Sequence, residues 1–317
     1  QWQKLIRDHP SIMFKQCDGF TLLTREQVQY QEFPHSFSQF KKQFGDLFIA
    51  SPICEPELKS GPRPRSDLLP ESESSLSIDY KGGEYSAFEH IKSYFSGTAP
   101  HSYKQTRNQL QGNNSSTRLS PWLANGSLSA RQALTCVEQY EELRGANEGT
   151  QWIRYELLWR EYFQWFSRHH GARLFRFTGI NGKRPLTSFY PQRFVSWCLG
   201  ETQYPLVNAC MKELNHTGFL SNRGRQIAAS CLVNELSLDW RAGAAYFESR
   251  LIDYDVASNW GNWQYIAGVG SDPRGGRHFN LEKQTLEYDA DGAYRKRWHA
   301  KSVTHAQPNI ADWPEIK

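Results

Sequence analysis

The strongest constraint on the fold is a run of large aromatic residues between positions 151 and 168. They recur at steps of three and four, which places the rings along one side of an α-helix. The residues are Trp152, Tyr155, Trp159, Tyr162, Phe163 and Phe166. Gly171 follows as a helix stop signal. Because aromatic residues make up 14% of the chain, we expect this helix to pack its rings against other rings in the core.

The rest of the chain beyond residue 84 also has a helical pattern. Further helices are predicted at 84–96, 128–143, 204–216, 223–236 and 241–250. Neither βαβ alternation nor an internal repeat is found there. No G-x-G-x-x-G opens a helix after a strand, which argues against a Rossmann nucleotide site. The predicted fold class is all-α.

The first 83 residues divide into two parts. In residues 1–50, phenylalanines recur at helical intervals, which predicts one amphipathic helix after a short leader. They are Phe33, Phe37, Phe40, Phe44 and Phe48. Residues 51–83 hold five prolines, the run Glu-Ser-Glu-Ser-Ser and the pair Gly82-Gly83, which predict an extended linker.

Composition argues against several classes of protein. The six cysteines are scattered with no Cys-x-x-Cys pair, so we expect no redox motif, disulfide framework or metal site. His169 and His170, adjacent at a predicted helix end, are a poor pattern for metal binding. No apolar span of 18 residues and no secretory leader is present, so we expect a soluble, cytoplasmic protein with no membrane partner.

Residues 251–265 combine acids, an amide and rings in a way that a plain core helix would not need. Asp253 and Asp255 lie two apart, and Asn259 follows four residues after the second. The rings that follow are Trp260, Trp263 and Tyr265. One interpretation is a site for a buried polar heterocycle, which needs hydrogen-bond partners along one edge and rings behind it. The other is a helix start capped by Asp253 or Asp255, with the tryptophans in the core. This segment alone leaves both open.

The net charge of +4 is too small to indicate nucleic-acid binding by itself, but its distribution is uneven. No acid lies between Glu89 and Glu138, whereas five cations do: Lys92, Lys104, Arg107, Arg118 and Arg131. Within this window, residues 113–121 supply hydroxyls, amides and a guanidinium just before a helical run. That composition suits an anion cradle at a helix start. A solvated basic face with a ligand-free capping loop is the alternative.

Two further clusters could carry chemistry. Glu156 and Arg160 form an i, i+4 pair, which is either a surface ion pair or part of a ring-walled pocket. Residues 222–226 are rich in cations and amides and enter a predicted helix. A buried Arg225 would need a carboxylate, and Asp253 and Asp255 are the candidates.

Taken in order, several blocks of the sequence resemble the flavin domain of the photolyase/cryptochrome family, and most of all its DASH-type cryptochromes. The blocks are 103–108 with 116–124, 156–163, 217–226, 251–267 and 268–280. The resemblance covers residues 84–298 and implies an all-α, photolyase-like FAD-binding domain preceded by an irregular linker. By this resemblance, residues 1–50 would be the last part of an α/β antenna domain, 51–83 the interdomain linker, and 84–317 the FAD- and DNA-binding domain.

The resemblance implies a U-shaped FAD inside the helices. Its implied contacts are Tyr103, Ser116, Thr117, Arg118, Leu119, Ser120, Trp152, Arg160, Asn222, Arg225, Asp253, Asp255 and Asn259. Arg225 would pair with Asp253 near the isoalloxazine, and Asn259 would face N5. A carboxylate held by arginine does not easily accept the flavin's proton, and an amide can adapt to either protonation state of N5. The antenna folate of full-length relatives, methenyltetrahydrofolate, is not expected in this chain.

The resemblance also implies a catalytic set. Trp197, Trp240 and Trp263 match the family's tryptophan chain, in which rings in contact pass electrons to an excited flavin. Core packing is the other role that these three rings could have. Glu156 and Asn259 complete the implied catalytic residues.

The implied substrate is a cyclobutane pyrimidine dimer flipped out of DNA, which is least costly in a single strand. Glu156 would hydrogen-bond the dimer, and Trp159 and Tyr265 would stack on it. The implied DNA contacts are Arg107, Glu156, Trp159, Asn222, Gln226, Tyr265 and Lys283. Gln226 and Tyr265 are the more polar, DASH-like choices, so a preference for single-stranded DNA is implied, with salt-dependent binding through the cations.

The implied function is FAD-dependent, blue-light-driven dimer repair by a monomeric, deoxyribodipyrimidine photolyase-like lyase of the DASH type. The alternative is a blue-light photoreceptor that signals through flavin redox state without repair, and a third possibility is a flavin-free DNA-binding remnant. Two departures from the family pattern stand out. Residues 202–208 read Thr-Gln-Tyr-Pro-Leu-Val-Asn where the family usually has Thr-Gly-Tyr-Pro-x-Val-Asp, and Trp260 replaces the commoner Tyr or Asn.

Overall fold

The computed structural model describes residues 2–13, 19–28, 33–52 and 80–303. In these residues the chain forms helices and no strand, with one isolated bridge between Ser188 and Leu238. The predicted all-α class is therefore confirmed. Most of the linker predicted at 51–83 lies outside the described residues, so its conformation stays a prediction.

The α-helices are α1 (Trp2–Asp8), α2 (Phe37–Phe44), α3 (Glu84–Ser96), α4 (Ala99–Thr106), α5 (Ser120–Asn125), α6 (Ala130–Arg144), α7 (Glu148–His170), α8 (Pro191–Leu199), α9 (Pro205–Thr217), α10 (Asn222–Ser230), α11 (Trp240–Arg250), α12 (Val256–Ala267), α13 (Leu281–Tyr288) and α14 (Ala293–Arg297). A 3-10 helix, η1 (Gly171–Phe175), follows α7, and a π-helical turn, η2 (Cys231–Glu235), follows α10. The helix predicted at 223–236 is thus an α-helix that widens into a π turn after Ser230.

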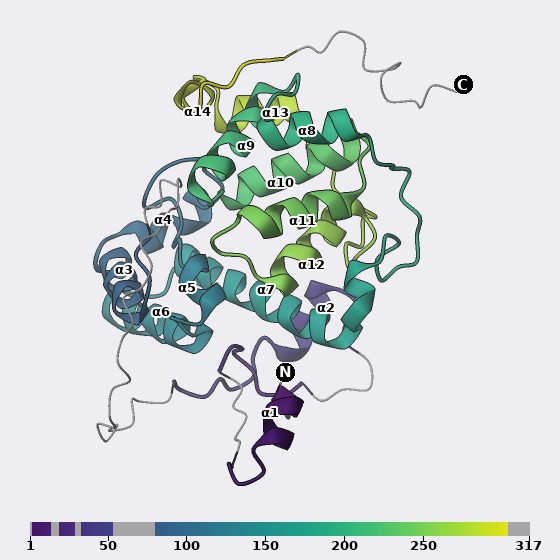
Figure 1. The fold of residues 1–317 in the computed structure, drawn as a ribbon. Helices are drawn as coiled ribbons and strands as arrows, with labels where there is room; N and C mark the ends of the chain where they lie inside the picture. Colours follow the sequence, from purple (N-terminus) through teal and green to yellow (C-terminus); the bar gives the residue numbers. More distant parts are fainter. Residues whose placement is uncertain (1, 14–18, 29–32, 53–79, 304–317) are drawn as a thin grey trace, which may run out of the picture.

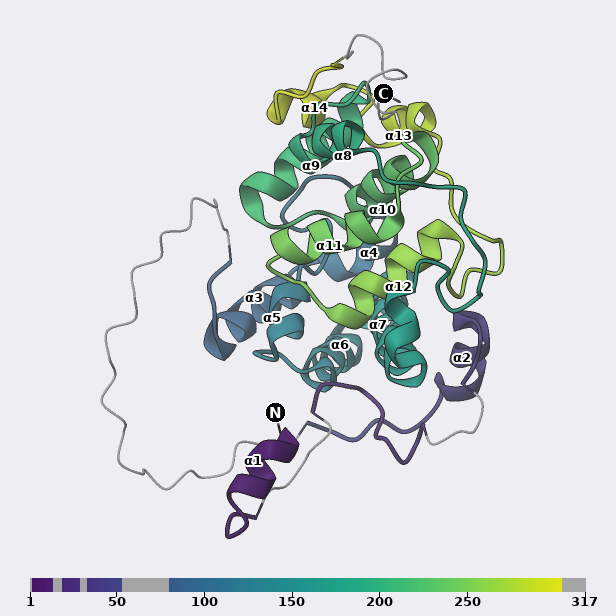
Figure 2. The same ribbon diagram turned by 45° about the vertical axis from the view of Figure 1, so that its right-hand side comes forward.

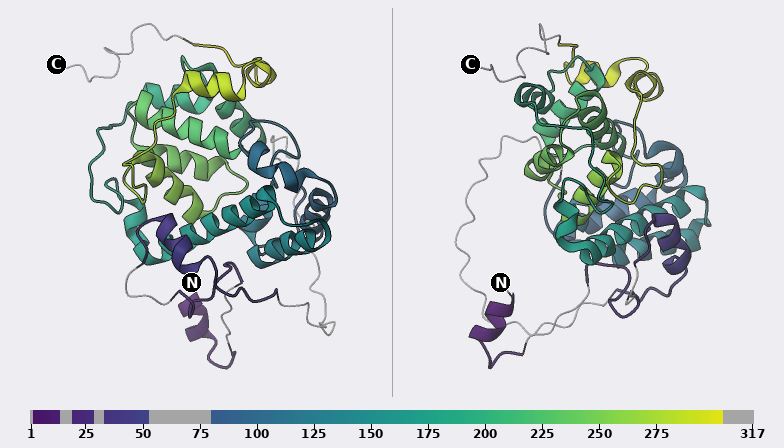
Figure 3. Two further views of the ribbon diagram at one scale, coloured as in Figure 1. Left: turned by 180° about the vertical axis from the view of Figure 1, so that it is seen from behind. Right: turned by 90° about the vertical axis from the view of Figure 1, so that its right-hand side faces the viewer.

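Two groups of helices meet along α7. Helices α3 to α6 gather on one side, α8 to α12 stack on the other, and α7 contacts α4, α6 and α12 (Figure 1). The same division is visible after a 45° turn (Figure 2). Seen from behind, α2 lies against α7, while α1 lies apart from the helical body (Figure 3). Residues from both groups therefore meet along α7.

Helix α7 has the aromatic face that the sequence predicts. Asn147 caps its first turn by accepting hydrogen bonds from the backbone N–H groups of Gly149 and Thr150 at 2.8 and 3.1 Å. The helix ends at Gly171, whose φ of 53° is the left-handed conformation that glycine adopts without strain. The rings of Tyr162, Phe163 and Phe166 are buried and contact one another. The predicted ring-on-ring packing is confirmed.

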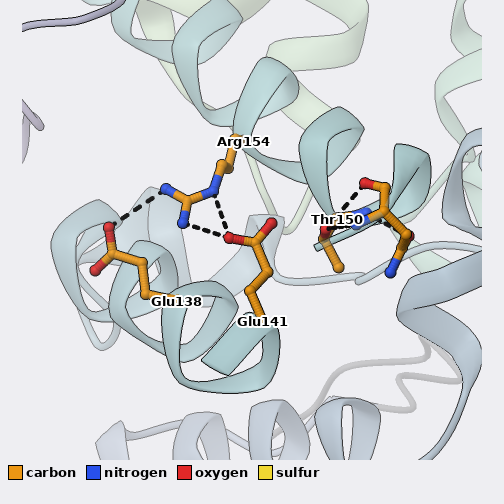
Figure 4. Close-up of polar contacts among 5 residues, drawn as sticks. Glu138, Glu141, Thr150 and Arg154 are labelled. Carbon is orange, nitrogen blue, oxygen red and sulfur yellow. Dashed lines mark hydrogen bonds and ion pairs between the residues drawn. The ribbon is translucent and has the colours of Figure 1, made fainter. Parts of the chain in front are cut away.

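A polar cluster ties α7 to α6 (Figure 4). Arg154 on α7 donates from Nη2 and Nε to one carboxylate oxygen of Glu141, at 2.6 and 3.1 Å, and from Nη1 to Glu138 at 3.3 Å. The hydrogen bonds and the charge of Arg154, helped by a hydrogen bond from Thr150, outweigh the desolvation of Glu141 and lower the pKa of its carboxyl. The cluster therefore joins α7 to one helix of the first group through polar contacts.

The N-terminal segment differs from its prediction. The phenylalanines of residues 1–50 do not form one continuous helix, because α2 begins after the Ser36 cap and ends at Gly45. Ser36 and Gln39 form a capping box, which defines the start of the helix. Phe37, Phe40 and Phe44 are buried along α2, whereas Phe33 precedes the helix and Phe48, 79% exposed, follows it. Only the central three phenylalanines share a helix face.

A buried carboxylate holds the segment at residues 21–23 against α7. Glu161 is 0% exposed and accepts hydrogen bonds from the backbone N–H groups of Leu22 and Leu23 at 2.8 and 3.0 Å, and from Trp165 Nε1 at 2.6 Å. Burial raises the pKa of the Glu161 carboxyl, while these three donors lower it. Every donor that faces this carboxylate would lose its partner if the side chain were removed.

We therefore expect Glu161→Ala to destabilise the protein by about 3 kcal/mol, because two backbone N–H groups and an indole would be left buried and unpaired. Chemical denaturation monitored by circular dichroism would measure the change. Glu142→Ala, at an exposed position on α6, is the matched control and should stay within about 0.5 kcal/mol of the wild type. Equal stability of both variants would contradict a role for Glu161 in holding the segment.

No helix among the described residues is both long and apolar enough to cross a membrane. The His, Cys, Asp and Glu side chains of the described residues form no group of three or more that could hold a metal ion.

Candidate functional site

A cavity of about 610 Å³ lies between the two helix groups. It is lined by the loop before α5, by α7, by the start of α10 and by α12 with the residues that precede it. A volume of this size is in the range of small-molecule and cofactor sites. The cavity brings together residues that lie as far apart in the sequence as Tyr103 and Phe279.

One end of the cavity is rich in hydroxyl groups. Ser116, Thr117 and Ser120 line it, with Tyr103 from α4 beside them. Arg118, in the same loop, has a φ of 50°, which is uncommon for a residue with a side chain. Its guanidinium lies 5.0 Å from the ring centroid of Phe219. The loop thus directs hydroxyls and one cation toward the same space, which suits an anionic ligand group.

The cavity wall also holds a buried ion pair with an unpartnered oxygen. Arg225 Nη2 donates to Asp253 Oδ2 at 2.7 Å, and Arg225 Nε donates to the Leu220 carbonyl at 2.8 Å. The Asp253 side chain is 1% exposed. Its second oxygen, Oδ1, is buried without a hydrogen-bond partner although the residue lines the cavity. A buried acceptor of this kind calls for a donor, such as a ring N–H of a ligand.

Asp255 and Asn259 show that the two interpretations of residues 251–265 are compatible. Asp255 Oδ1 caps α12 by accepting from the backbone N–H of Ser258 at 2.7 Å, and it accepts from Gln164 Nε2 at 2.8 Å. Asn259 Nδ2 donates to the Ala244 carbonyl at 3.0 Å. Both residues also line the cavity. The segment is therefore a capped helix start and a cavity wall.

A second set of side chains lies where α4 meets α7. Arg107 Nη1 forms an ion pair with Glu156 Oε1 at 2.6 Å. Burial raises the pKa of the Glu156 carboxyl, and the charge of Arg107 lowers it in part. The pKa of Glu156 is raised overall, so its carboxyl group binds a proton more readily than that of an exposed glutamate.

Trp159 is held between other rings. Its ring stacks on Phe37 of α2 with a centroid distance of 3.7 Å and an interplanar angle of 10°. It meets Tyr265 edge to face at 5.9 Å. Tyr265 in turn accepts a hydrogen bond from Arg277 Nη2 at 2.5 Å. Because Trp159 and Tyr265 both line the cavity, they offer aromatic surface for a flat ligand.

Comparison with known proteins agrees with this geometry. A sequence profile described as the FAD binding domain of DNA photolyase matches residues 152–314. The chain is 51% identical to a cryptochrome DASH of Idiomarina loihiensis over 96% of its length, and 49% identical to one of Vibrio parahaemolyticus over 98%. These matches span 70% and 71% of the two relatives. The chain belongs to the photolyase/cryptochrome family, among its DASH-type cryptochromes.

Solved structures of family members have the same fold. The chain is similar to a cryptochrome from Synechocystis sp. PCC6803, with a TM-score of 0.76 and 40% identity over 88% of the chain. It is also similar to a class III photolyase from Agrobacterium tumefaciens, with a TM-score of 0.80 and 26% identity over 93%. The chain spans only 61% and 64% of these two proteins. The activity of a whole family protein is therefore a proposal for this chain.

The cavity contains nearly all the flavin contacts implied by the family resemblance. Those that line it are Tyr103, Ser116, Thr117, Arg118, Leu119, Ser120, Arg160, Asn222, Arg225, Asp253, Asp255 and Asn259. Trp152 lies outside the cavity lining and packs beneath the cations of Lys104 and Arg107. Arg160 lines the cavity, but Nη1 and Nη2 donate to the carbonyls of Phe20 and Leu123 at 2.8 and 3.3 Å. These bonds orient Arg160 toward neighbouring backbone.

The residues expected to meet DNA are also gathered, with one exception. Arg107, Glu156, Trp159, Asn222, Gln226 and Tyr265 line the cavity. Lys283 lies on α13 at an exposed position outside the lining. Arg223 also lines the cavity and was not predicted to do so, although it lies within the cluster at 222–226. Its guanidinium lies between the rings of Phe279 and Tyr288 at 5.3 and 5.0 Å.

The three expected electron-transfer tryptophans are not in one simple row. Trp263 lines the cavity, and its ring meets Trp197 at a centroid distance of 6.2 Å. Trp240 instead meets Trp260 at 5.8 Å. In the sequence, Trp260 stands out as one of the rings after Asn259 and as a departure from the family pattern, but no local signal shows that it touches Trp240.

Proposed function

We propose that this chain binds FAD in the cavity and uses blue light to repair cyclobutane pyrimidine dimers in DNA, with a preference for single strands. The observation that carries the proposal is the unpartnered Oδ1 of Asp253, a buried residue that lines the same cavity of cofactor size as the hydroxyl-rich loop. The membership in a family whose profile is a photolyase FAD-binding domain supports it.

The donor and acceptor pattern fits a flavin. Asp253 Oδ1 can accept from a ring N–H, while Arg225 Nη2 occupies the other carboxylate oxygen, Oδ2, at 2.7 Å. The Nδ2 of Asn259 is held by the Ala244 carbonyl, so its Oδ1 is the atom that can accept from a proton-bearing N5. The hydroxyls at 116–120 would hold the pyrophosphate. When bound, the flavin would supply light-driven one-electron chemistry.

The other cavity wall fits a flipped pyrimidine dimer. Trp159 and Tyr265 offer rings for stacking, and Glu156 can donate to a base carbonyl when its raised pKa leaves it protonated. Arg107 would release Glu156 and meet a phosphate when DNA enters, which makes binding salt-dependent. A single strand needs no unpairing of the dimer, which supports the preference.

The first test is a visible absorption spectrum of the purified protein, where bound FAD gives a yellow preparation. The second is Glu156→Ala, which should leave the FAD content unchanged and lower repair of an irradiated oligo-dT substrate. We expect a loss of about 10- to 100-fold in kcat/KM, since one hydrogen bond to a polar substrate group is removed. Unchanged repair by this variant would reject the proposed role of Glu156.

One observation favours a second candidate, a photoreceptor without repair. Glu156 is already engaged by Arg107 at 2.6 Å, so it must leave this partner before it can donate to a dimer. Illumination of the FAD-bound protein without dimer turnover, on single- and double-stranded substrates alike, would favour this candidate over repair.

A further inference from the structure

A second, smaller cavity lies beside the one of 610 Å³. Its volume is about 40 Å³, which is enough for a few water molecules or a small ion. Its walls come from the loop before α5, from α9 and the turn after it, and from the end of α14, which packs on α9 (Figure 1). Arg118 and Phe219 line both cavities. The other residues of this small cavity are not among the implied flavin or DNA contacts.

Two guanidinium groups line the small cavity without a carboxylate partner. Arg118 Nη1 donates to Asn113 Oδ1 at 3.5 Å, a long hydrogen bond. Arg297 is exposed, and its guanidinium lies 5.6 Å from the ring centroid of Trp298. Within the described residues, neither arginine takes part in an ion pair. Most of their N–H groups are therefore available to a ligand.

The neutral groups of the wall add donors rather than acceptors. Trp298 Nε1 is buried and has no hydrogen-bond partner. Asn113 Oδ1 already accepts from Arg118, which leaves its Nδ2 as a donor. The Thr217 hydroxyl is engaged by the backbone, at 2.8 and 3.0 Å from the carbonyl oxygens of Glu213 and Phe219. A small cavity with unused donors and two cations suits a ligand that is negatively charged and accepts hydrogen bonds.

The acid in this wall, Glu213, is suited to hold a proton near neutral pH. Its side chain is buried, and Oε2 accepts a hydrogen bond from the Tyr294 hydroxyl. Burial raises the pKa of the Glu213 carboxyl to about 7, although this hydrogen bond and the nearby guanidinium groups lower it in part. When protonated, Glu213 no longer repels an anion and offers one more donor.

The surroundings of Glu213 contain few other groups that change charge in the same pH range. Burial raises the pKa of the Tyr294 hydroxyl and of the Cys210 thiol, so both stay neutral. His216, whose ring lies 5.7 Å from that of Trp298, can also change its charge in the neutral range. The charged and titratable groups around Glu213 are Arg118, Arg225, Arg297, Tyr294, Cys210, His216 and Asp289, of which Asp289 is paired with Arg295 at 2.6 Å.

We propose that the small cavity binds an oxyanion such as phosphate through Arg118, Arg297 and Trp298 Nε1, and that Glu213 takes up a proton when the anion binds. This site goes beyond the proposed function, because it needs neither a flavin nor a dimer. The oxyanion can be a free ion or a phosphate of the DNA backbone, since both present the same acceptor oxygens to these donors.

Isothermal titration calorimetry of the full chain with sodium sulfate tests the site. Sulfate keeps one charge between about pH 6 and pH 8, and sodium chloride holds the ionic strength constant. We expect binding about tenfold tighter at pH 6 than at pH 8, because the protonated fraction of Glu213 falls by that factor when its pKa is about 7. Binding is thus present below this pKa and is lost as the pH rises through it.

Three variants locate the bound anion. Arg297→Gln and Trp298→Phe should each weaken sulfate binding on the order of tenfold or more, because one donor to a charged acceptor is lost. Lys296→Gln, at an exposed position on the same helix, is the matched control and should bind as the wild type. Wild-type affinity in both Arg297→Gln and Trp298→Phe overturns the site. If Trp298→Phe fails to fold, Arg297→Gln at its exposed position still decides.

Glu213→Gln tests the proton coupling separately. An amide keeps a donor at this place and does not titrate, so sulfate should bind this variant equally well at both pH values. A tenfold pH dependence that persists in Glu213→Gln and disappears in His216→Asn assigns the proton to His216 and overturns the role of Glu213.

Two further titrations identify the source of the oxyanion and separate this site from the flavin. An undamaged oligo-dT that displaces sulfate, and binds Arg297→Gln more weakly than Lys296→Gln, identifies a DNA phosphate; no displacement identifies a free ion. Sulfate that binds the chain only after FAD is removed shows that the flavin's own phosphates fill the small cavity, which overturns a separate site. A colourless preparation contradicts the proposed function, whereas the sulfate titration still decides this inference.

Discussion

Asp253→Ala is expected to give a folded but colourless protein. The substitution removes the buried, unpartnered acceptor of a cavity-lining residue and leaves Arg225 without its partner at 2.7 Å. Removing one member of a buried charge pair at a binding site costs about 3 kcal/mol or more, which weakens FAD binding roughly a hundredfold. The ratio of flavin to protein after gel filtration, and titration of the apoprotein with FAD, would measure this change.

Two further variants make the Asp253 experiment specific. Asp46→Ala, at an exposed position after α2, should retain the full flavin content. Asp253→Asn keeps the size of the side chain but loses its charge, so we expect partial retention. A yellow Asp253→Ala protein with wild-type affinity would show that the orphan oxygen is not a flavin contact, and would remove the main support for the cavity as the FAD site.

Gly149→Ala is expected to disrupt the junction of α4 and α7. A Cβ at Gly149 would lie 2.1 Å from the Pro100 carbonyl oxygen and 2.5 Å from that of His101. Both atoms belong to the backbone of α4, so neither can move away alone. Overpacking against backbone costs about 3 kcal/mol, and the shift of α4 would displace Tyr103 and Arg107 from the cavity. Thermal denaturation and the flavin content would both report the change.

The chain offers a matched control for this glycine. Gly97, next to α4, has a φ of −94°, and no atom lies within 4 Å of the place that a Cβ would take there. Gly97→Ala should therefore be nearly neutral. A Gly149→Ala protein with wild-type stability and flavin content would contradict the close approach of the two helices.

The local parts of the site could be predicted from the sequence. The hydroxyl-rich loop at 116–120 and the polar segment at 253–259 each show their chemistry within a few residues. A carboxylate partner for Arg225 was also expected, with Asp253 and Asp255 as candidates, because a buried guanidinium requires one. The choice of Asp253 was implied by the family resemblance. The predicted bounds of α3 and α7 lie close to the observed ones. Both helices could be predicted because the periodic spacing of apolar residues is a local signal.

The short elements were harder to predict. Helices α8 and α13 have only nine and eight residues and were not predicted, because so short a segment shows too few turns for a periodic pattern to be recognised. The phenylalanines of residues 1–50 led to the opposite error, because their spacing continues beyond the ends of α2 that Ser36 and Gly45 set. A regular spacing of apolar residues predicts one face of a helix only between the residues that cap its two ends.

The sequence was enough to predict the all-α class and the long aromatic helix α7, and its family resemblance implied which residues would contact a flavin and a DNA base. Which of them meet became known only from the packed helices: Trp159 stacks on Phe37, Arg107 engages Glu156, and Trp240 touches Trp260. The physical reason is that chemical type and periodicity are properties of neighbouring residues. Contact between distant segments depends instead on how whole helices pack. The absence of a side chain at Gly149, for example, allows α7 to approach the backbone of α4 closely.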